Sequence, residues 1–196
     1  MPGGHGLTTR GAESGYGPVR GTRLEHTTIH LTGDRSEGFD CHGGCNPAIL
    51  RMRNNIVQAV QKVGFADGSF DEDHNLYWGG ERRFRAGPHS RVAEPRFVDD
   101  FAGDLHLGLG SPAADLGAPL GVRSDLDGRT LPLDGDRDGT ARPDAGAFER
   151  GGRGVGLTVH ADRGSSMTSK PVAMLLADLG VTKTHWRDPL SSVPCL

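Results

Sequence analysis

The chain has 196 residues, of which 22 are Lys or Arg and 25 are Asp or Glu, so its formal net charge is −3 at pH 7. This balance argues against a generally basic nucleic-acid-binding protein. Glycine (31 residues) and proline (12 residues) are frequent and only 35% of the residues are hydrophobic, which excludes a helical bundle or a coiled coil. No apolar run approaches the ~18 residues of a membrane-spanning helix, so no transmembrane segment is expected.

The N-terminal residues 1–20 are rich in glycine and lack the apolar segment of a signal peptide. The chain is therefore expected to begin partway through a larger protein, and its localisation stays open. Its three cysteines, Cys41, Cys45 and Cys195, are too few for a disulfide scaffold. Cys41 and Cys45 suggest zinc, but a structural zinc site needs a second ligand pair, and none is evident. We expect ordinary turn residues there.

Three short segments predict strands: Thr27–Leu31, Ile49–Val57 and His74–Trp78. Thr28, Asn55 and Asn75 stand at equivalent places in them, which gives an irregular period of about 20–27 residues. Such a period is typical of a solenoid whose turns contribute short strands, with Asn at the bends bonding the neighbouring backbone. A β-sandwich with coincidental spacing is the alternative.

Five motifs follow one another in the region 94–149. They are Glu94–Asp99, Gly103–Leu107, Gly110–Gly117, Asp125–Arg129 and Pro143–Glu149. In this order they resemble the C-terminal end of right-handed parallel β-helix proteins of the pectate-lyase-like superfamily, and residues 43–80 resemble the preceding turns. The resemblance implies a mainly β fold: a truncated right-handed parallel β-helix with a C-terminal cap. Residues 1–93 would form incomplete turns without an N-terminal cap, and residues 94–150 the C-terminal end. It also implies a secreted or cell-surface protein associated with polysaccharide.

The segment 155–185 follows a glycine-rich stretch, residues 146–154, which marks a domain boundary. Val155–His160 predicts a strand and Val181–His185 resumes an extended pattern. Between them, residues 168–180 predict a helix that begins with a capping hydroxyl and ends at a glycine. Its apolar stripe consists of Val172, Leu175, Leu176 and Leu179.

Residues Leu157–His185 closely resemble the catalytic core of insertion-sequence transposases of the DDE, retroviral-integrase-like superfamily. Residues 155–196 would then be a short strand–helix fragment of a ribonuclease-H-like α/β fold. In that family Asp162 would be the second of three carboxylates that hold two Mg²⁺ ions for attack on a DNA phosphodiester. The sheet carrying the first Asp is missing, and the final Glu is expected about 35 residues after Asp162, beyond Leu196. We expect a fragment without strand-transfer activity, so that DNA is a partner only of an intact relative.

Two acidic patterns each have two interpretations. Asp134, Asp136 and Asp138 have the spacing of a Ca²⁺ loop, although Ala145 stands where a bidentate Glu is needed; the alternative is an acidic surface turn. Residues 71–74, Asp-Glu-Asp-His, resemble a paired-carboxylate site for acid–base catalysis, and the alternative is a solvated bend.

Two further patterns involve basic side chains. A basic run suggests phosphate binding, although abundant Asp and Glu nearby favour a solvated face: Arg82, Arg83, Arg85 and Arg91. His160 precedes Asp162 by two positions, so the two side chains share a face if the strand continues. In an intact transposase this His would lie near the metal site; the alternative is an exposed strand end.

The sequence thus predicts a chimeric or truncated chain. It would be a non-catalytic β-helix module, associated with a surface or a carbohydrate, that carries a transposase remnant. One alternative is a transposase or integrase-type protein acting in DNA integration by Mg²⁺-dependent phosphodiester transfer. A second alternative is a polysaccharide lyase or hydrolase. Mg²⁺ is expected only for an intact transposase core, and Ca²⁺ in the β-helix end.

Overall fold

The computed structural model describes residues 4–10, 19–135 and 138–151, together with two short strands at 159–160 and 183–184. The chain divides into two units, Met1–Gly152 and Arg153–Leu196. The division falls inside the glycine-rich stretch 146–154. Each unit is described by itself below.

The described part of the first unit is built from short strands and contains no helix. The strands are β1 (His5–Arg10), β2 (Thr22–Glu25), β3 (Thr28–Leu31), β4 (Glu37–His42), β5 (Leu50–Arg53), β6 (Ile56–Ala66), β7 (Asp71–Asp73), β8 (Leu76–Arg83), β9 (Arg91–Val92), β10 (Phe97–Asp99) and β11 (Asp104–Leu107). Within the described residues, β2, β5 and β7 form one parallel sheet, and β1, β4, β6, β8 and β9 form a second, to which β3 is joined through β6. The prediction of a mainly β fold with parallel strands is confirmed.

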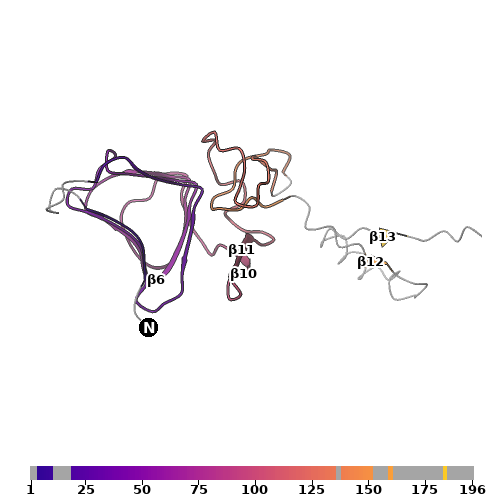
Figure 1. Ribbon diagram of the computed structural model, residues 1–196, viewed down its shortest axis with the longest axis horizontal. Helices are drawn as coiled ribbons and strands as arrows, with labels where there is room; N and C mark the ends of the chain where they lie inside the picture. Colours follow the sequence, from indigo (N-terminus) through magenta and orange to yellow (C-terminus); the bar gives the residue numbers. More distant parts are fainter. Residues whose placement is uncertain (1–3, 11–18, 136–137, 152–158, 161–182, 185–196) are drawn as a thin grey trace, which may run out of the picture. The chain divides into compact units, whose positions relative to one another are not determined.

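Successive strands pair with the strand one circuit further along the chain. Thr28 pairs with Ile56, and Ile56 pairs in turn with Leu76. We call the strands of residues 4–10 and 19–92 the stacked strands. In Figure 1 their indigo-to-magenta circuits follow nearly the same outline, as the parallel pairing requires. The predicted equivalence of Asn55 with Asn75 is therefore correct, whereas Thr28 is equivalent to Ile56 and not, as predicted, to Asn55.

This error of a single position has a local cause. The segment Ile49–Val57, predicted as one strand, is broken by a bend at Asn54 (φ 56°). Similar bends at His26 (φ 48°) and His74 (φ 57°) come just before the strands β3 and β8. Asn54 ends β5 before β6 begins, and His74 separates β7 from β8. The left-handed region is uncommon for residues other than glycine, although Asn and His enter it more often than most. None of these positions carries the glycine that would have indicated a bend.

A stack of buried polar side chains follows these bends. The side-chain oxygen of Asn55 accepts a hydrogen bond from the N–H of Thr27 (3.0 Å), and that of Asn75 accepts one from the N–H of Asn55 (2.8 Å). The amide nitrogens of Asn55 and Asn75 donate to the carbonyls of Leu24 and Met52. Both asparagines are fully buried. Each circuit is thus bonded to the next at the same corner, as the sequence predicted for Asn at the bends.

The main hydrophobic cluster lies between the two parallel sheets. Its buried members are Phe39, Cys41, Cys45, Ile49, Leu50, Met52, Val57, Val63 and Tyr77. Phe84 follows β8 and packs against the rings of Phe39, Tyr77 and Phe70 at centroid distances of 4.9, 5.0 and 5.9 Å. Burial of each large apolar side chain stabilises the fold by about 1.5–3 kcal/mol.

Cys41 and Cys45 form a disulfide, although the sequence predicted ordinary turn residues. The turn between them directs the N–H groups of Gly43, Gly44 and Cys45 at the carboxylate of Asp67, at 2.7, 3.0 and 2.7 Å. These hydrogen bonds, that of Gly44 foremost, lower the pKa of Asp67. Asp67 lies one circuit further along the chain, so the turn is fastened to its neighbour.

Residues 93–135 and 138–151, the C-terminal segment, contain the antiparallel pair β10–β11 and otherwise irregular backbone. A second apolar cluster joins this segment to the stacked strands: Ile56, Leu76, Leu107, Ala113, Leu116 and Ala145. Asn54 accepts from the N–H of Ala118 and donates to its carbonyl, at 2.8 and 2.7 Å. Gly146 has a φ of 102°, and a Cβ there would lie 2.8 Å from both Ile56 and Thr28. The segment therefore packs closely against β3 and β6.

In the second unit the structure describes β12 (Val159–His160) and β13 (Lys183–Thr184), which pair in parallel. Both strands fall within segments that the sequence predicted to be extended. The helix predicted over 168–180 lies outside the described residues. Among the described residues, no helix has the length and apolar character needed to cross a membrane.

Replacing Asn75 by Ala is expected to lower the free energy of unfolding by about 2–4 kcal/mol, because the buried N–H of Asn55 and the carbonyl of Met52 lose their partners. Urea unfolding followed by circular dichroism measures the change. The matched control is Gln61→Ala at an exposed position, which should shift the free energy by less than about 0.5 kcal/mol. Equal values for the two variants would contradict a structural role for the stack.

Candidate functional site

The outer face of the sheet β2–β5–β7 carries alternating charges. Arg51 lies between Glu25 and Asp71, with nitrogen–oxygen distances of 3.4 and 3.5 Å. Arg53 pairs with Asp71 and lies 3.5 Å from Asp73. Because alternate residues of a strand face the same side, the sheet presents a ladder of ion pairs that ends at Asp73 on its last strand.

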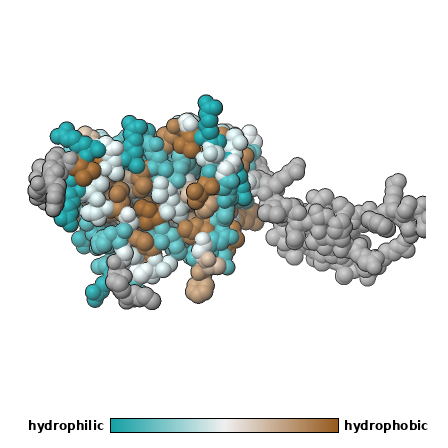
Figure 2. Space-filling model, in the orientation of Figure 1, coloured by the Kyte–Doolittle hydropathy of each residue, from teal (hydrophilic) through white to brown (hydrophobic). Residues whose placement is uncertain are grey.

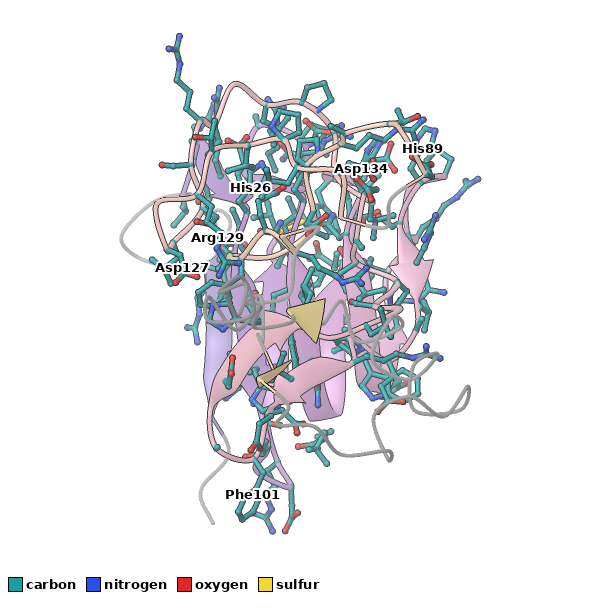
Figure 3. All side chains as sticks on the ribbon, turned by 90° about the vertical axis from the view of Figure 1, so that its right-hand side faces the viewer. His26, His89, Phe101, Asp127, Arg129 and Asp134 are labelled. Carbon is teal, nitrogen blue, oxygen red and sulfur yellow. A yellow bond between two sulfur atoms is a disulfide. The ribbon has the colours of Figure 1, made fainter. Side chains whose placement is uncertain are left out.

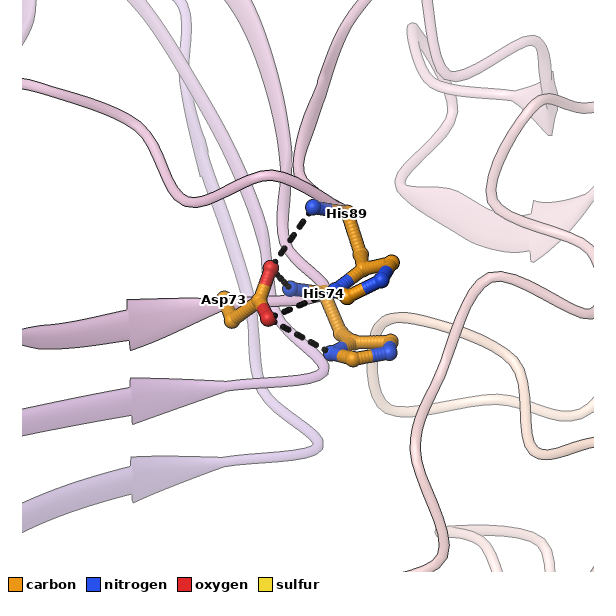
Figure 4. Close-up of side chains that lie close together, drawn as sticks. All are labelled: Asp73, His74 and His89. Carbon is orange, nitrogen blue, oxygen red and sulfur yellow. Dashed lines mark hydrogen bonds and ion pairs between the residues drawn. The ribbon is translucent and has the colours of Figure 1, made fainter.

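Two histidines meet the carboxylate of Asp73 (Figure 4). Oδ2 of Asp73 lies 2.8 Å from Nδ1 of His89 and 3.4 Å from Nδ1 of His74. Oδ1 accepts hydrogen bonds from the backbone N–H groups of His74 (3.0 Å) and His89 (2.8 Å). The two imidazole rings are stacked, with centroids 4.6 Å apart and planes inclined by 21°. One carboxylate therefore gathers two rings from separate segments of the chain, one before β8 and one after it.

The protonation states at this cluster follow from burial and hydrogen bonding. Burial would raise the pKa of Asp73, but the side-chain and backbone hydrogen bonds from His89, with the backbone bond from His74, outweigh burial and lower it. Burial is also the main reason that the pKa of His74 is lowered, with Asp73 opposing. At neutral pH the cluster therefore contains an ionised Asp73 beside a neutral His74.

A cleft of about 260 Å³ borders the two rings. Its lining residues are His74, Pro88, His89, Ser90, Arg91, Asp115, Leu116, Gly117 and Arg142. The stacked strands and their turns supply one side of the cleft and the C-terminal segment supplies the other. His89 is accessible from it, since its side chain is 62% exposed.

Glu72 lies on the opposite face of β7 from Asp71 and Asp73 and is buried. Its carboxylate accepts hydrogen bonds from Tyr77 Oη and Asn75 Nδ2, each at 2.8 Å, and also from Ser90 and the N–H of Gly87. Burial, with Glu72 nearby, raises the pKa of Tyr77. The predicted acidic group at 71–74 is therefore divided between the two faces of a strand, and Glu72 is not part of a solvated bend.

The acidic repeat predicted to bind Ca²⁺ is described only in part. Asp134 Oδ2 accepts a hydrogen bond from the N–H of Gly139 (3.1 Å), and Asp138 Oδ1 accepts one from Thr140 (2.7 Å). Asp136 lies outside the described residues, and so does Asp162, the predicted Mg²⁺ ligand. Cys41 and Cys45 are joined to each other, so neither offers a thiolate to zinc.

The predicted basic run does not form a shared anion site among the described residues. Arg83 pairs with Glu81 at 2.8 Å, and Arg82 lies 5.6 Å from the centroid of the Phe84 ring. Arg91 donates to the carbonyl of Pro112. These side chains are exposed, in agreement with the interpretation as a solvated face.

A buried carboxyl pair in the C-terminal segment lies within the motif Pro143–Glu149, for which the sequence predicted no chemical role. Asp144 and Glu149 are 1% and 2% exposed. Asp144 accepts from the N–H groups of Asp115 and Arg150, and Glu149 from those of Asp144 and Leu133. Burial raises the pKa of Asp144 to about 7 and that of Glu149 above its ordinary value. Because each oxygen accepts a backbone hydrogen bond, the pair fixes the conformation of irregular backbone.

His106 joins β11 to the turn at Asp127. Its Nε2 lies 2.8 Å from Asp127, its Nδ1 contacts Asp104, and its ring packs on Phe148 at 4.2 Å. In Figure 3, Asp127 and Arg129 lie close together, and Arg129 contacts Asp127 at 3.3 Å. The two carboxylates, Asp127 first and then Asp104, raise the pKa of His106.

Comparison of the chain with protein-family models, with curated protein sequences and with solved structures found no match. Functional conclusions therefore depend on the geometry and chemistry of the described residues.

His106 should stabilise the protein in a pH-dependent way. A histidine whose pKa is raised on folding contributes stability that is complete below the unfolded-state value of 6.5 and is lost as the pH rises through the folded-state value. We expect wild type to exceed His106→Gln in unfolding free energy at pH 5.5, by less than about 1 kcal/mol because the pair is partly exposed. The difference should shrink by pH 8.5.

Urea unfolding of both proteins at the two pH values measures this effect. The rise in the pKa of Asp144 also makes stability fall as the pH rises, but it is common to both proteins and cancels in their difference. A difference that stays constant with pH would show that His106 contributes packing against Phe148 and no charge interaction.

Proposed function

We propose that residues 4–151 form the last turns and C-terminal cap of a right-handed parallel β-helix, and that this module binds polysaccharide without cleaving it. The parallel register of the stacked strands supports the architecture, since each strand lies beside the strand one circuit further on. The five motifs of the region 94–149 fall in the irregular segment that packs against these strands, where the end of such a helix would lie.

The single observation that carries the binding proposal is an exposed tryptophan on a parallel sheet. Trp78 on β8 is 39% exposed and pairs with Gln58 on β6. Val60, 48% exposed, lies two positions beyond Gln58 on β6. An indole face accepts the C–H face of a pyranose ring, and neighbouring polar groups bond its hydroxyls. On the face drawn in Figure 2, apolar and hydrophilic residues are intermingled, as is ordinary for a protein surface.

The three carboxylates of β7 support a non-catalytic role. Asp71 is held by Arg51 and Arg53, Asp73 by two backbone N–H groups and His89, and Glu72 is enclosed. General acid–base catalysis requires a group that can exchange a proton with a substrate within hydrogen-bonding reach. The disulfide supports exposure to an oxidising environment, where most disulfide-bonded proteins function.

For the second unit we propose a remnant of a DDE transposase core that has no strand-transfer activity. The parallel pairing of β12 with β13 agrees with the strand order expected around the predicted helix. Two-metal catalysis requires several carboxylates around the ions. Residues 150–196 contain three acidic residues, Asp162, Asp178 and Asp188, and no Glu.

Polysaccharide binding is tested by affinity electrophoresis of the purified chain in gels that contain polygalacturonate, alginate or a neutral glucan. We expect retardation by at least one polymer and a loss of affinity of about tenfold in Trp78→Ala, which corresponds to one stacking contact. The matched control is Phe101→Ala, which removes a fully exposed ring from the turn between β10 and β11. Equal retardation of the two variants would reject Trp78 as the binding residue.

The same polymers serve to test the absence of cleavage. We expect neither new reducing ends nor unsaturated products after prolonged incubation. Release of either, with its loss in Asp71→Asn or Asp73→Asn, would assign the chain to the polysaccharide lyases or hydrolases.

The second unit is tested by incubating the purified chain with supercoiled plasmid and Mg²⁺. We expect no conversion to the nicked form, in either wild type or Asp162→Ala, because one carboxylate of a triad cannot position two ions. Nicking by wild type that disappears in Asp162→Ala would overturn the proposal and favour a DNA-processing enzyme.

A further inference from the structure

The stacked histidines leave one buried nitrogen without a hydrogen bond to any described residue. Nδ1 of His74 is buried and makes no hydrogen bond with the described residues, although it lies 3.4 Å from Oδ2 of Asp73. That oxygen already accepts the hydrogen bond from Nδ1 of His89. Hydrogen bonding therefore holds the imidazole of His89, whereas the imidazole of His74 is held by ring stacking and makes no hydrogen bond with the described residues. A buried polar atom without a partner is costly in a folded protein.

We propose that Asp73, His74 and His89 bind a divalent transition-metal ion of the zinc type, through Oδ2 of the carboxylate and Nδ1 of each imidazole. Each of the three residues offers one donor atom, and these atoms lie within 4.8 Å of one another. Zinc binds imidazole nitrogen and carboxylate oxygen at ~2.0–2.2 Å, so two donors of a tetrahedral site lie about 3.3 Å apart. The His74–Asp73 distance of 3.4 Å already matches this value.

The His89–Asp73 distance of 2.8 Å is a hydrogen-bond distance, so the side chain of His89 must move outward when the ion enters. Such a shift is feasible, since His89 lies on a turn after Pro88 and its side chain is 62% exposed. The stacked rings hold both Nδ1 atoms on the side that faces Asp73, as Figure 4 shows. Two imidazoles and one carboxylate are a donor set that suits zinc and its neighbours better than Ca²⁺ or Mg²⁺.

The charges around the cluster are compatible with a dication. The ladder that ends at Asp73 contains three carboxylates and two guanidiniums: Glu25, Asp71, Asp73, Arg51 and Arg53. Within this ladder Arg53 is the cation next to Asp73, but Arg53 lies closer to Asp71 than to Asp73. The ladder carries one negative charge in excess, and Glu72 adds another behind it. Arg91, Arg142 and Asp115 line the cleft on the other side of the rings, so the charged groups near the site have a small negative sum that favours a cation.

The fourth coordination position would open onto the cleft of about 260 Å³ that His74 and His89 line. Three protein ligands and one exchangeable water are the arrangement of catalytic zinc sites, whereas structural sites use four protein ligands. The site is thus suited to an ion whose water can be replaced. It is distinct from Trp78, so this inference does not depend on polysaccharide binding.

The test is titration of the metal-free full-length chain with Co²⁺, whose visible absorption reports coordination, and with Zn²⁺ by calorimetry. We expect one ion per chain, with an affinity at least about tenfold lower in His89→Ala. The matched control is His5→Ala. His5 is 58% exposed and lies 3.5 Å from Glu37, so it is a similar histidine–carboxylate pair without a second histidine. Absence of binding by wild type, or equal loss in both variants, would overturn the proposal.

A second variant separates ligation from folding. His74→Asn keeps a residue that tolerates positive φ at the bend and removes the buried imidazole. For His74→Asn we expect weaker Co²⁺ binding and, in the absence of metal, an unchanged urea midpoint. Zn²⁺ should raise the melting temperature of wild type and His5→Ala, but not that of His74→Asn or His89→Ala. A rise of equal size in all four proteins would place the ion elsewhere in the chain and reject this site.

Discussion

The hydrogen bonds of Asn55 and Asn75 connect three successive circuits of the chain at one corner. Each side chain replaces a backbone partner that the bend takes away, and each is wholly enclosed. Because an unsatisfied buried amide is costly, the corner cannot open at one circuit without exposing groups of the next. The position of β7, and hence of Asp73 and His74, follows from this corner, since Asn75 also donates to the carbonyl of Asp73.

The alternation of side chains along β7 then separates two kinds of carboxylate chemistry. Asp71 and Asp73 face outward and pair with Arg53, while Glu72 faces inward and accepts from Tyr77 and Asn75. Three consecutive acidic residues thus enter two separate networks. One network holds the end of the hydrophobic cluster together, and the other ends at the two stacked histidines beside the cleft.

Much of this arrangement could be predicted from the sequence, and the exceptions have physical causes. The spacing of Asn55 and Asn75 predicted parallel stacking with the correct register, because equivalent residues recur once per circuit. The bends at His26, Asn54 and His74 were missed, since nothing in their residue type requires a positive φ. The contact of His89 with Asp73 was also missed. The circuit that contains His89, after Phe84, is shorter than the earlier circuits, so its residues do not repeat the earlier spacing. The disulfide between Cys41 and Cys45 was missed as well, because its formation depends on the geometry of the turn, which the spacing of the two cysteines alone does not specify.

Parallel strands with alternating apolar and polar residues can pair in a register that is shifted by one or by two positions. A slip by one position turns the apolar side chains outward, but a slip by two positions keeps every side chain on its proper face. The carboxylate of Asp67, held by three N–H groups of the turn closed by Cys41 and Cys45, opposes the second kind of slip. A displacement by two positions would move Asp67 by about 6.6 Å and leave all three donors without an acceptor. A rigid turn on one circuit therefore selects the correct alignment of the next.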